Sequence, residues 1–159
     1  GNWAAKKSFI ERIALAFAAS LLMILLGAFF VHGLRDYSLP AEWIKNAARA
    51  SDVIPDPVSL SRVITSAATF FGLVSGEAWI RQLGGFQASG LIEKRALRYL
   101  VGLVGVFIFW YGLGAVFPHG EALFPYIMRF IRYALLGFWI SGGAPWLFFR
   151  FNLAEQANR

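Results

Sequence analysis

The stretch that decides the fold runs from residue 13 to residue 31 and reads IALAFAASLLMILLGAFFV. It contains no charged residue, and about 20 apolar residues let a helix cross the ~30 Å hydrocarbon core of a bilayer. The run is too long for the apolar part of a signal peptide, so we expect the helix to be retained. The stretch therefore predicts a membrane-spanning helix over about residues 10–34.

Three further apolar runs follow, over about residues 62–81, 97–117 and 124–149. The chain has 159 residues, of which 58% are hydrophobic and 15% charged, and its mean hydropathy is +0.57. A soluble domain of this size could not cover so much apolar side chain. We predict an all-α integral membrane protein, a four-helix bundle that forms one transmembrane domain over residues 1–159.

The connection between the first two spans has its own pattern. Residues 40–50 read PAEWIKNAARA, and helical spacing puts Trp43, Ile44, Ala47 and Ala48 on one face, with Pro40 suited to a first turn. This predicts a short amphipathic helix that lies at the membrane surface. Ser59 or Ser61 is expected to cap the second span.

The net charge of +6 comes from basic residues near the ends of the apolar runs. This placement favours contact with anionic lipid headgroups and excludes nucleic acid as the preferred partner. More basic residues flank one side than the other, so we expect both termini in the cytoplasm and the chain in a cytoplasmic (inner) membrane. The residues on that side are Lys6, Lys7, Arg12, Arg81, Lys94, Arg95, Arg98, Arg150 and Arg159.

Small residues mark the expected helix contacts. Gly72 and Gly76 form a Gly-x-x-x-Gly pattern in the second span, and Gly102 and Gly105 lie in the third. Such residues let helix backbones approach closely, either within one bundle or between two copies of the chain. The segment 141–145, SGGAP, should bend the end of the fourth span.

Two groups of charged residues occur inside the spans. Glu77 and Arg81 are four residues apart, so they can pair across one helical turn, as a structural ion pair or as part of a transport or proton-relay path. Arg129 and Arg132 share a face of the fourth span. Both are candidate contacts for a lipid or phosphate group, because the guanidinium fork matches phosphate oxygens.

The depth of the two arginines restricts their partners. Glu77 lies toward the opposite end of its helix, so the candidate partners are Asp36, Glu121 or a lipid phosphate. Arg129 is nearer the start of its span, where its side chain can extend to the headgroups. Arg132 lies deeper and is harder to explain in that way.

The sequence contains few residues in patterns that are typical of catalytic or metal-binding sites. It has no cysteine, and it has no Gly-rich phosphate loop, Gly-x-Ser-x-Gly segment or His-Glu-x-x-His pair. His32 and Asp36 have a spacing that could orient an imidazole, although both residue types are ordinary at a helix end, and His119 is isolated. We therefore expect no metal, no cofactor and no catalytic residue.

Four segments in the second half of the chain resemble a known family. Gly84-Gly85-Phe86, residues 94–105, residues 131–139 and residues 144–148 together are similar to the C-terminal membrane region of bacterial type-2 phosphatidic acid phosphatase family proteins. The resemblance covers residues 84–155 most clearly. It implies a membrane-embedded helical region related to that of a lipid phosphatase.

The reactive segments of those enzymes are missing here. The family uses Lys-x6-Arg-Pro, Pro-Ser-Gly-His and Ser-Arg-x5-His-x3-Asp segments, and Leu25 and Leu26 stand where the Ser-Arg of the third would precede His32. We predict a non-catalytic membrane subunit or scaffold that packs with a larger membrane protein. The alternatives are the C-terminal membrane half of a lipid phosphatase whose catalytic motifs lie outside this chain, and a lipid or small-solute carrier.

Overall fold

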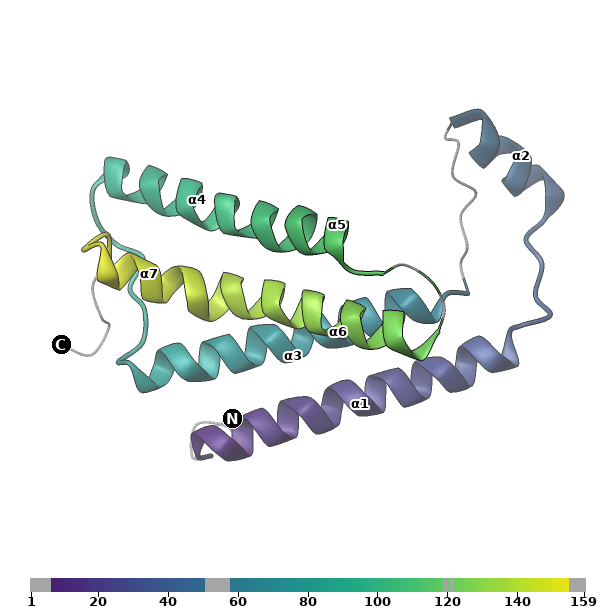
Figure 1. Ribbon diagram of the computed structural model, residues 1–159, viewed down its shortest axis with the longest axis horizontal. Coiled ribbons are helices and arrows are strands. Elements are labelled where there is room, and N and C mark those ends of the chain that lie inside the picture. The colour runs from purple at the N-terminus through teal and green to yellow at the C-terminus, as the bar shows by residue number, and fades with distance from the viewer. Residues whose placement is uncertain (1–6, 51–57, 119, 121, 155–159) are drawn as a thin grey trace.

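Four long apolar helices dominate the structure (Figure 1). The computed structural model describes residues 7–50, 58–118, 120 and 122–154, and within these it is helical and contains no strand. Each long helix is long and apolar enough to cross a membrane, which confirms the predicted all-α class with four spans. The four run over Phe9–Gly33 (α1), Leu60–Gln82 (α3), Ile92–Val116 and Leu123–Arg150.

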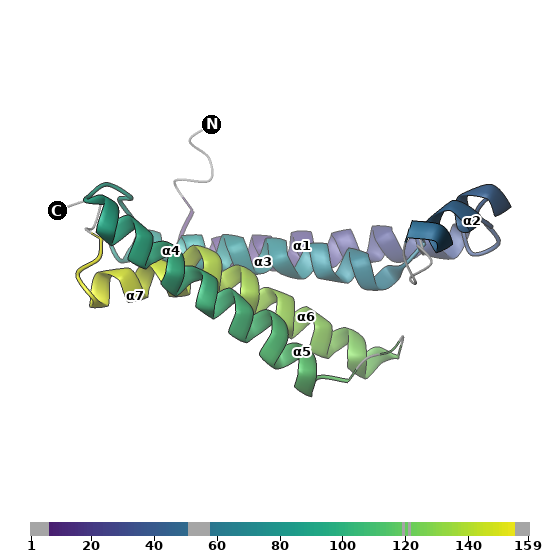
Figure 2. The same ribbon diagram turned by 90° about the horizontal axis from the view of Figure 1, so that it is seen from above.

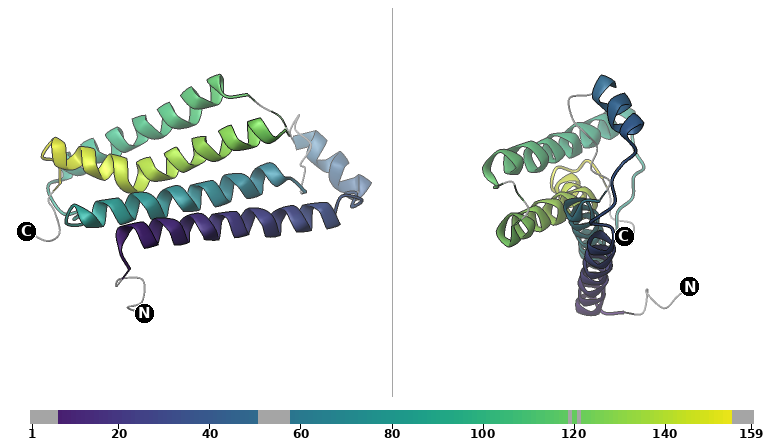
Figure 3. Two further views of the ribbon diagram at one scale, coloured as in Figure 1. Left: turned by 60° about the horizontal axis from the view of Figure 1, so that its bottom comes forward. Right: turned by 90° about the vertical axis from the view of Figure 1, so that its right-hand side faces the viewer.

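The third and fourth spans are each interrupted by a π turn, in which one extra residue widens the helix. The third consists of α4 (Ile92–Phe107), η2 (Ile108–Gly112) and α5 (Leu113–Val116). The fourth consists of α6 (Leu123–Phe138), η3 (Trp139–Gly143) and α7 (Ala144–Arg150). Neither π turn was predicted, although the expected bend after residue 140 is visible where α6 passes into α7 (Figure 3).

The four spans lie in the order α1, α3, α6, α4, so that the bundle is open (Figures 1 and 3). α3 is the central helix and has more buried residues than any other helix in the described part of the chain. The third span starts earlier than predicted, at Ile92, because the charged Glu93-Lys94-Arg95 turn is also helical. Viewed from above, α4 and α6 cross α1 and α3 at an angle and diverge from them toward η2 and α5 (Figure 2).

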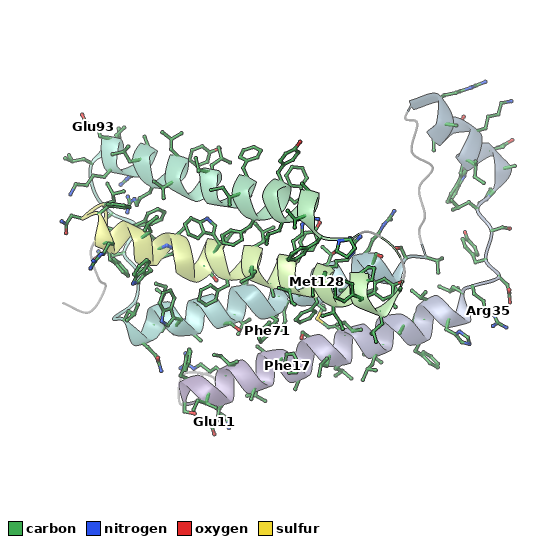
Figure 4. The ribbon with its side chains drawn as sticks, viewed as in Figure 1. Glu11, Phe17, Arg35, Phe71, Glu93 and Met128 are labelled. Atoms are coloured by element: carbon green, nitrogen blue, oxygen red, sulfur yellow. The ribbon has the colours of Figure 1, made fainter. Side chains whose placement is uncertain are left out.

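An aromatic cluster joins the first three helices of this row. The ring centroid of Phe71 on α3 lies 5.5 Å from that of Phe17 on α1 and 6.0 Å from that of Phe130 on α6. Figure 4 shows Phe17 and Phe71 between α1 and α3. Ser20 on α1 is fully buried, and its hydroxyl donates to the Phe17 carbonyl. Small and aromatic side chains thus pack α1 against the central helix.

α3 and the fourth span touch backbone to backbone. A Cβ added at Gly76 would lie 2.8 Å from the Gly142 nitrogen, and one at Gly137 would lie 2.6 Å from the Thr69 carbonyl oxygen. A Cβ at Gly72 would collide with the carbonyl of Ala134. Gly72 and Gly76 therefore pack inside this chain, and any side chain at either position would separate α3 from α6.

The two glycines of the third span differ from each other. A Cβ at Gly105 would collide with the indole ring of Trp139, so this position must remain small. A Cβ at Gly102 would meet no atom within 4 Å. The contribution of Gly102 comes from its carbonyl, which accepts a hydrogen bond of 3.1 Å from Trp139 Nε1.

The predicted amphipathic helix is present as α2 (Ala41–Ala50), beyond the far end of α1. Trp43 on its apolar face is 62% exposed. Its position at a membrane surface remains a prediction. Ser59 occupies the N-cap position of α3 but makes no side-chain capping bond, whereas an unpredicted capping box joins Ser8 and Glu11 at the start of α1.

Candidate functional site

Arg132 projects from α6 toward the third span. Its Nη2 donates a hydrogen bond of 2.7 Å to the carbonyl oxygen of Trp110, and its guanidinium carbon lies 5.1 Å from the ring centroid of Tyr133. Its Nε is buried and has no hydrogen-bond partner in the described part of the chain. The side chain is half-buried, so most of its donors remain available.

The acceptor for Arg132 is supplied by η2. A π turn disrupts the regular bonding of carbonyls four residues back along the helix, so a carbonyl within it can accept from a side chain. Gly114, one turn later, leaves room for the guanidinium, because a Cβ there would lie 2.9 Å from Arg132 Nη2. The turn and the glycine together create space for a cation between two spans.

A cavity of about 300 Å³ borders this guanidinium; it is lined by Trp110, Tyr111, Gly114, Ala115 and Arg132. We call it the η2 cavity. Tyr111 is 75% exposed and Trp110 50% exposed, and no side chain of η2 is buried. The cavity therefore opens sideways, toward the surroundings of the spans.

Arg129 does not line the η2 cavity. It is half-buried, and the structure shows no hydrogen bond or ion pair for it among the described residues. The two arginines lie about one turn apart on α6, but the structure gives them different surroundings. Of these two arginines, Arg132 is the one that borders a cavity and donates a hydrogen bond among the described residues.

The structure also bears on the expected carboxylate partners. Asp36 Oδ2 lies 3.7 Å from Arg35 Nε, and the Asp36 side chain is almost fully exposed. Asp36 therefore pairs with Arg35 and not with Arg132. Glu77 is bound to Arg81. Glu121, the remaining candidate, lies outside the described residues. Within the described ranges, no carboxylate pairs with Arg132.

Glu77 and Arg81 form an ion pair along α3, with Arg81 Nε donating to the Glu77 carboxylate. Both side chains are substantially exposed. They border a cavity of about 550 Å³ that is also lined by Ile80, Gly84, Gly85, Phe86, Ser141 and Pro145. Exposed pairs of this kind contribute little stability, about 0.3–0.5 kcal/mol.

Arg98 is a buried cation whose role the sequence analysis did not identify. It is 7% exposed, its Nη2 donates to the carbonyls of Ala88 and Ser89 at 2.9 and 3.2 Å, and it lies over the ring of Phe86. Gly84, Gly85 and Gly90 adopt positive φ angles, which fold this loop back toward α4. The glycines in the sequence signalled a tight loop, but nothing indicated that it encloses an arginine.

A second missed feature is the polar bonding around η3. Ser141 Oγ donates to the carbonyls of Leu73 and Gly137, at 2.8 and 3.1 Å. Pro145, which follows η3, lacks an N–H, and in a regular helix its ring would clash with the Ser141 carbonyl. The wider turn avoids this clash and directs the serine hydroxyl to α3.

The histidine candidates do not form a site in the described residues. His32 is exposed, and Asp36 pairs with Arg35. His119 falls outside the described residues. No group of three or more His, Asp or Glu residues that could hold a metal ion occurs within the described ranges.

Comparison with protein families gives one match. Residues 64–156, more than half of the chain, match the family described as PAP2 superfamily phosphatase, transmembrane extension. The chain belongs to this family. No curated protein and no solved structure matches the chain.

The transmembrane extension includes α3, α4, α6 and both π turns, whereas α1 and α2 precede it. The sequence resemblance was clearest from residue 84 onward, whereas the family match begins at residue 64, within α3. The structure explains why α3 belongs with the later helices, since Gly72 and Gly76 contact the backbone of the fourth span directly. Arg98, Arg132 and the Glu77–Arg81 pair all lie within the extension.

Proposed function

We propose that this chain is a non-catalytic membrane scaffold that packs against a phosphatase of the PAP2 superfamily. The family description supports this proposal, because an extension accompanies a phosphatase. The scaffold role of this chain is inferred from how its buried and half-buried basic groups are used.

The observation that carries the proposal is the separation of Arg98 and Arg132. A phosphatase site needs several cationic donors around one phosphate, together with a nucleophile. Here Arg98 binds loop carbonyls before α4, and Arg132 binds a carbonyl in η2 at the other end of the same span. The two arginines therefore bind carbonyls at opposite ends of the third span and cannot share one phosphate.

The test is purification of a tagged chain from its native membrane in mild detergent. We expect a PAP2 superfamily phosphatase to co-purify, and lipid phosphatase activity to follow that partner and not the isolated chain. Recovery of the chain alone would contradict the scaffold role. Release of phosphate by the isolated chain would contradict its non-catalytic character.

The catalytic segments could instead belong to the same polypeptide. Reading the genomic frame upstream of the codon for Gly1 tests this second possibility, which the family description favours equally. A Pro-Ser-Gly-His segment in that frame would make this chain the membrane half of a phosphatase. The scaffold would then act within one protein and not between two.

We also propose that the end of the molecule carrying the start of α1 and the end of α7 faces the cytoplasm. Figure 4 shows Glu11 and Glu93 at this end and Arg35 at the other. The excess of basic residues at this end supports the orientation. Within the described residues they are Lys7, Arg12, Arg81, Lys94, Arg95, Arg98 and Arg150, against Arg35, Lys45, Arg49 and Arg62 at the opposite end.

The orientation can be tested cleanly because the chain has no cysteine. In intact cells, a membrane-impermeant thiol reagent should label the Asn46→Cys variant on α2. The Ser89→Cys variant, in the loop before α4, should react only after permeabilisation. The reverse labelling pattern would overturn the orientation.

A further inference from the structure

We propose that Arg132, Gly114 and η2 form a binding site for the phosphate group of a phospholipid. The argument begins with the charge of Arg132. A guanidinium within the hydrocarbon core is costly unless it finds a partner. No carboxylate supplies that partner in the described parts of the chain.

The guanidinium keeps most of its hydrogen-bonding capacity. Of its five N–H groups, one binds the Trp110 carbonyl. Nε is buried without an acceptor among the described residues. A buried donor without an acceptor is destabilising, so the structure favours a ligand that brings oxygen atoms to this side chain.

The η2 cavity has the size for such a group. Its volume of about 300 Å³ is roughly ten times the ~30 Å³ of one water molecule in the liquid. A phosphate group fits this space, and its oxygens can accept from the guanidinium fork. Gly114 keeps the space open, because a side chain there would press against the guanidinium.

The position in the membrane indicates that the phosphate comes from a lipid. The fourth span has 28 residues, so it is about 42 Å long and extends about 6 Å beyond each face of a ~30 Å core. Arg132 lies nine residues, about 13 Å, from the start of α6, which places it about 7 Å inside the core. Snorkelling and local thinning can join a headgroup to a cation at that depth.

The exposed rings of Trp110 and Tyr111 also suit a lipid ligand. Such rings are enriched where acyl chains meet headgroups. They border the cavity on its open side, next to the bilayer. A phospholipid can therefore present its phosphate to Arg132 while its acyl chains remain among other lipids.

The proposal is tested by native mass spectrometry of the detergent-purified chain titrated with dioleoyl phosphatidylglycerol. Arg132→Gln should weaken binding about ten-fold, as expected for loss of a charge-assisted bond. Gly114→Val, which keeps the arginine but crowds the cavity, should weaken it similarly. Arg129→Gln removes a charge one turn away and should leave binding unchanged.

Two further ligands distinguish the phosphate of a phospholipid from free phosphate. Phosphate-free dioleoylglycerol should bind the wild-type chain and Arg132→Gln equally weakly, and sodium phosphate alone should not occupy the site. Binding of sodium phosphate in preference to the lipid would overturn the lipid assignment. Equal phospholipid binding by the wild type and Arg132→Gln would overturn the site itself.

A last arm tests Glu121 as an internal partner. If Glu121→Gln lowers the thermal stability of the delipidated chain as much as Arg132→Gln does, the two residues pair and the proposal fails. If the Glu121 variant keeps both its stability and its phospholipid affinity, the lipid remains as the partner of Arg132.

Discussion

The two π turns, η2 and η3, use the same backbone distortion in opposite ways. η3 faces the centre of the protein, where Gly142 lies against Gly76 and Ser141 binds an α3 carbonyl. η2 has no buried side chain and borders a cavity. A widened turn can therefore bring two helices into contact or create space beside a cation, depending on what the neighbouring span presents.

Deleting one residue from each turn should give the largest contrast. Ile140 in η3 and Ile108 in η2 form a matched pair, because both side chains are well exposed. Deletion of Ile140 removes the extra residue of η3, so the turn closes to a regular α-helix in which the Pro145 ring clashes with the carbonyl four residues before it. We expect no monodisperse folded protein by size-exclusion chromatography.

Deletion of Ile108 should be much milder. It closes η2 to a regular α-helix beside α5, which has no buried residue, and the Trp110 carbonyl then bonds along the helix and no longer accepts from Arg132. The expected loss is about 1 kcal/mol of unfolding free energy, measured by thermal unfolding in detergent. Equal damage from the two deletions would show that the turns do not differ as described.

Gly76→Ala should destabilise the protein more than any of the substitutions that follow. Its Cβ would lie 2.8 Å from the Gly142 nitrogen and the Phe138 carbonyl oxygen, and neither backbone atom can move without separating α3 from η3. Overpacking of this kind costs about 1–3 kcal/mol, and we expect the upper end in a thermal unfolding measurement.

Gly102→Ala is the control for the Gly76 variant. Its Cβ would meet no atom within 4 Å, so stability should change by less than about 0.5 kcal/mol. A similar loss of stability in Gly76→Ala and Gly102→Ala would mean that these glycines are needed for helix flexibility and not for close contact between helices.

Trp139→Phe should have a smaller effect. The phenyl ring can still pack on Gly105, but the hydrogen bond from Nε1 to the Gly102 carbonyl is lost. We expect the unfolding free energy to fall by about 1 kcal/mol. Trp110→Phe in η2 provides the comparison, and because only its main-chain carbonyl is used, its stability should stay close to that of the wild type.

Ser141→Ala should have the smallest measurable effect, about 0.6 kcal/mol, the usual value for a hydrogen bond between membrane helices. It removes the hydroxyl that donates to Leu73. Ser75→Ala is the matched control, since the Ser75 hydroxyl is buried and has no partner in the described ranges. That variant should be neutral or slightly more stable, and a larger loss there than at Ser141 would contradict the assigned bonds.

The number of spans and the amphipathic helix could be predicted from the sequence, because they depend on apolar run length and helical spacing. Gly72 and Gly76 could be marked as candidates for helix contact because they are small residues one helical turn apart. The order of the spans could not be predicted, since each helix exposes apolar residues on several sides and lipid solvates all of them equally. The bend near Pro145 was expected, whereas the π turn that produces it was not.

The candidate site was only partly predictable. Arg132 stood out because it is a charge within an apolar run. The role of Arg98 was not recognised, because a basic residue near a span end is ordinarily counted as a topology signal. Nothing in the sequence indicated that the Trp110 carbonyl would accept a hydrogen bond from Arg132. A main-chain acceptor becomes available only once the helix departs from regular geometry.

The central position of α3 has a consequence for biosynthesis. The ribosome makes α3 before the third and fourth spans, yet α3 makes its closest contacts with the fourth span. α1 can insert and pack against α3 at once. The glycine contacts between α3 and the fourth span cannot form until residues 134–142 have entered the membrane. A nascent chain stopped before that point would expose an incomplete α3 surface, and membrane quality control could recognise it.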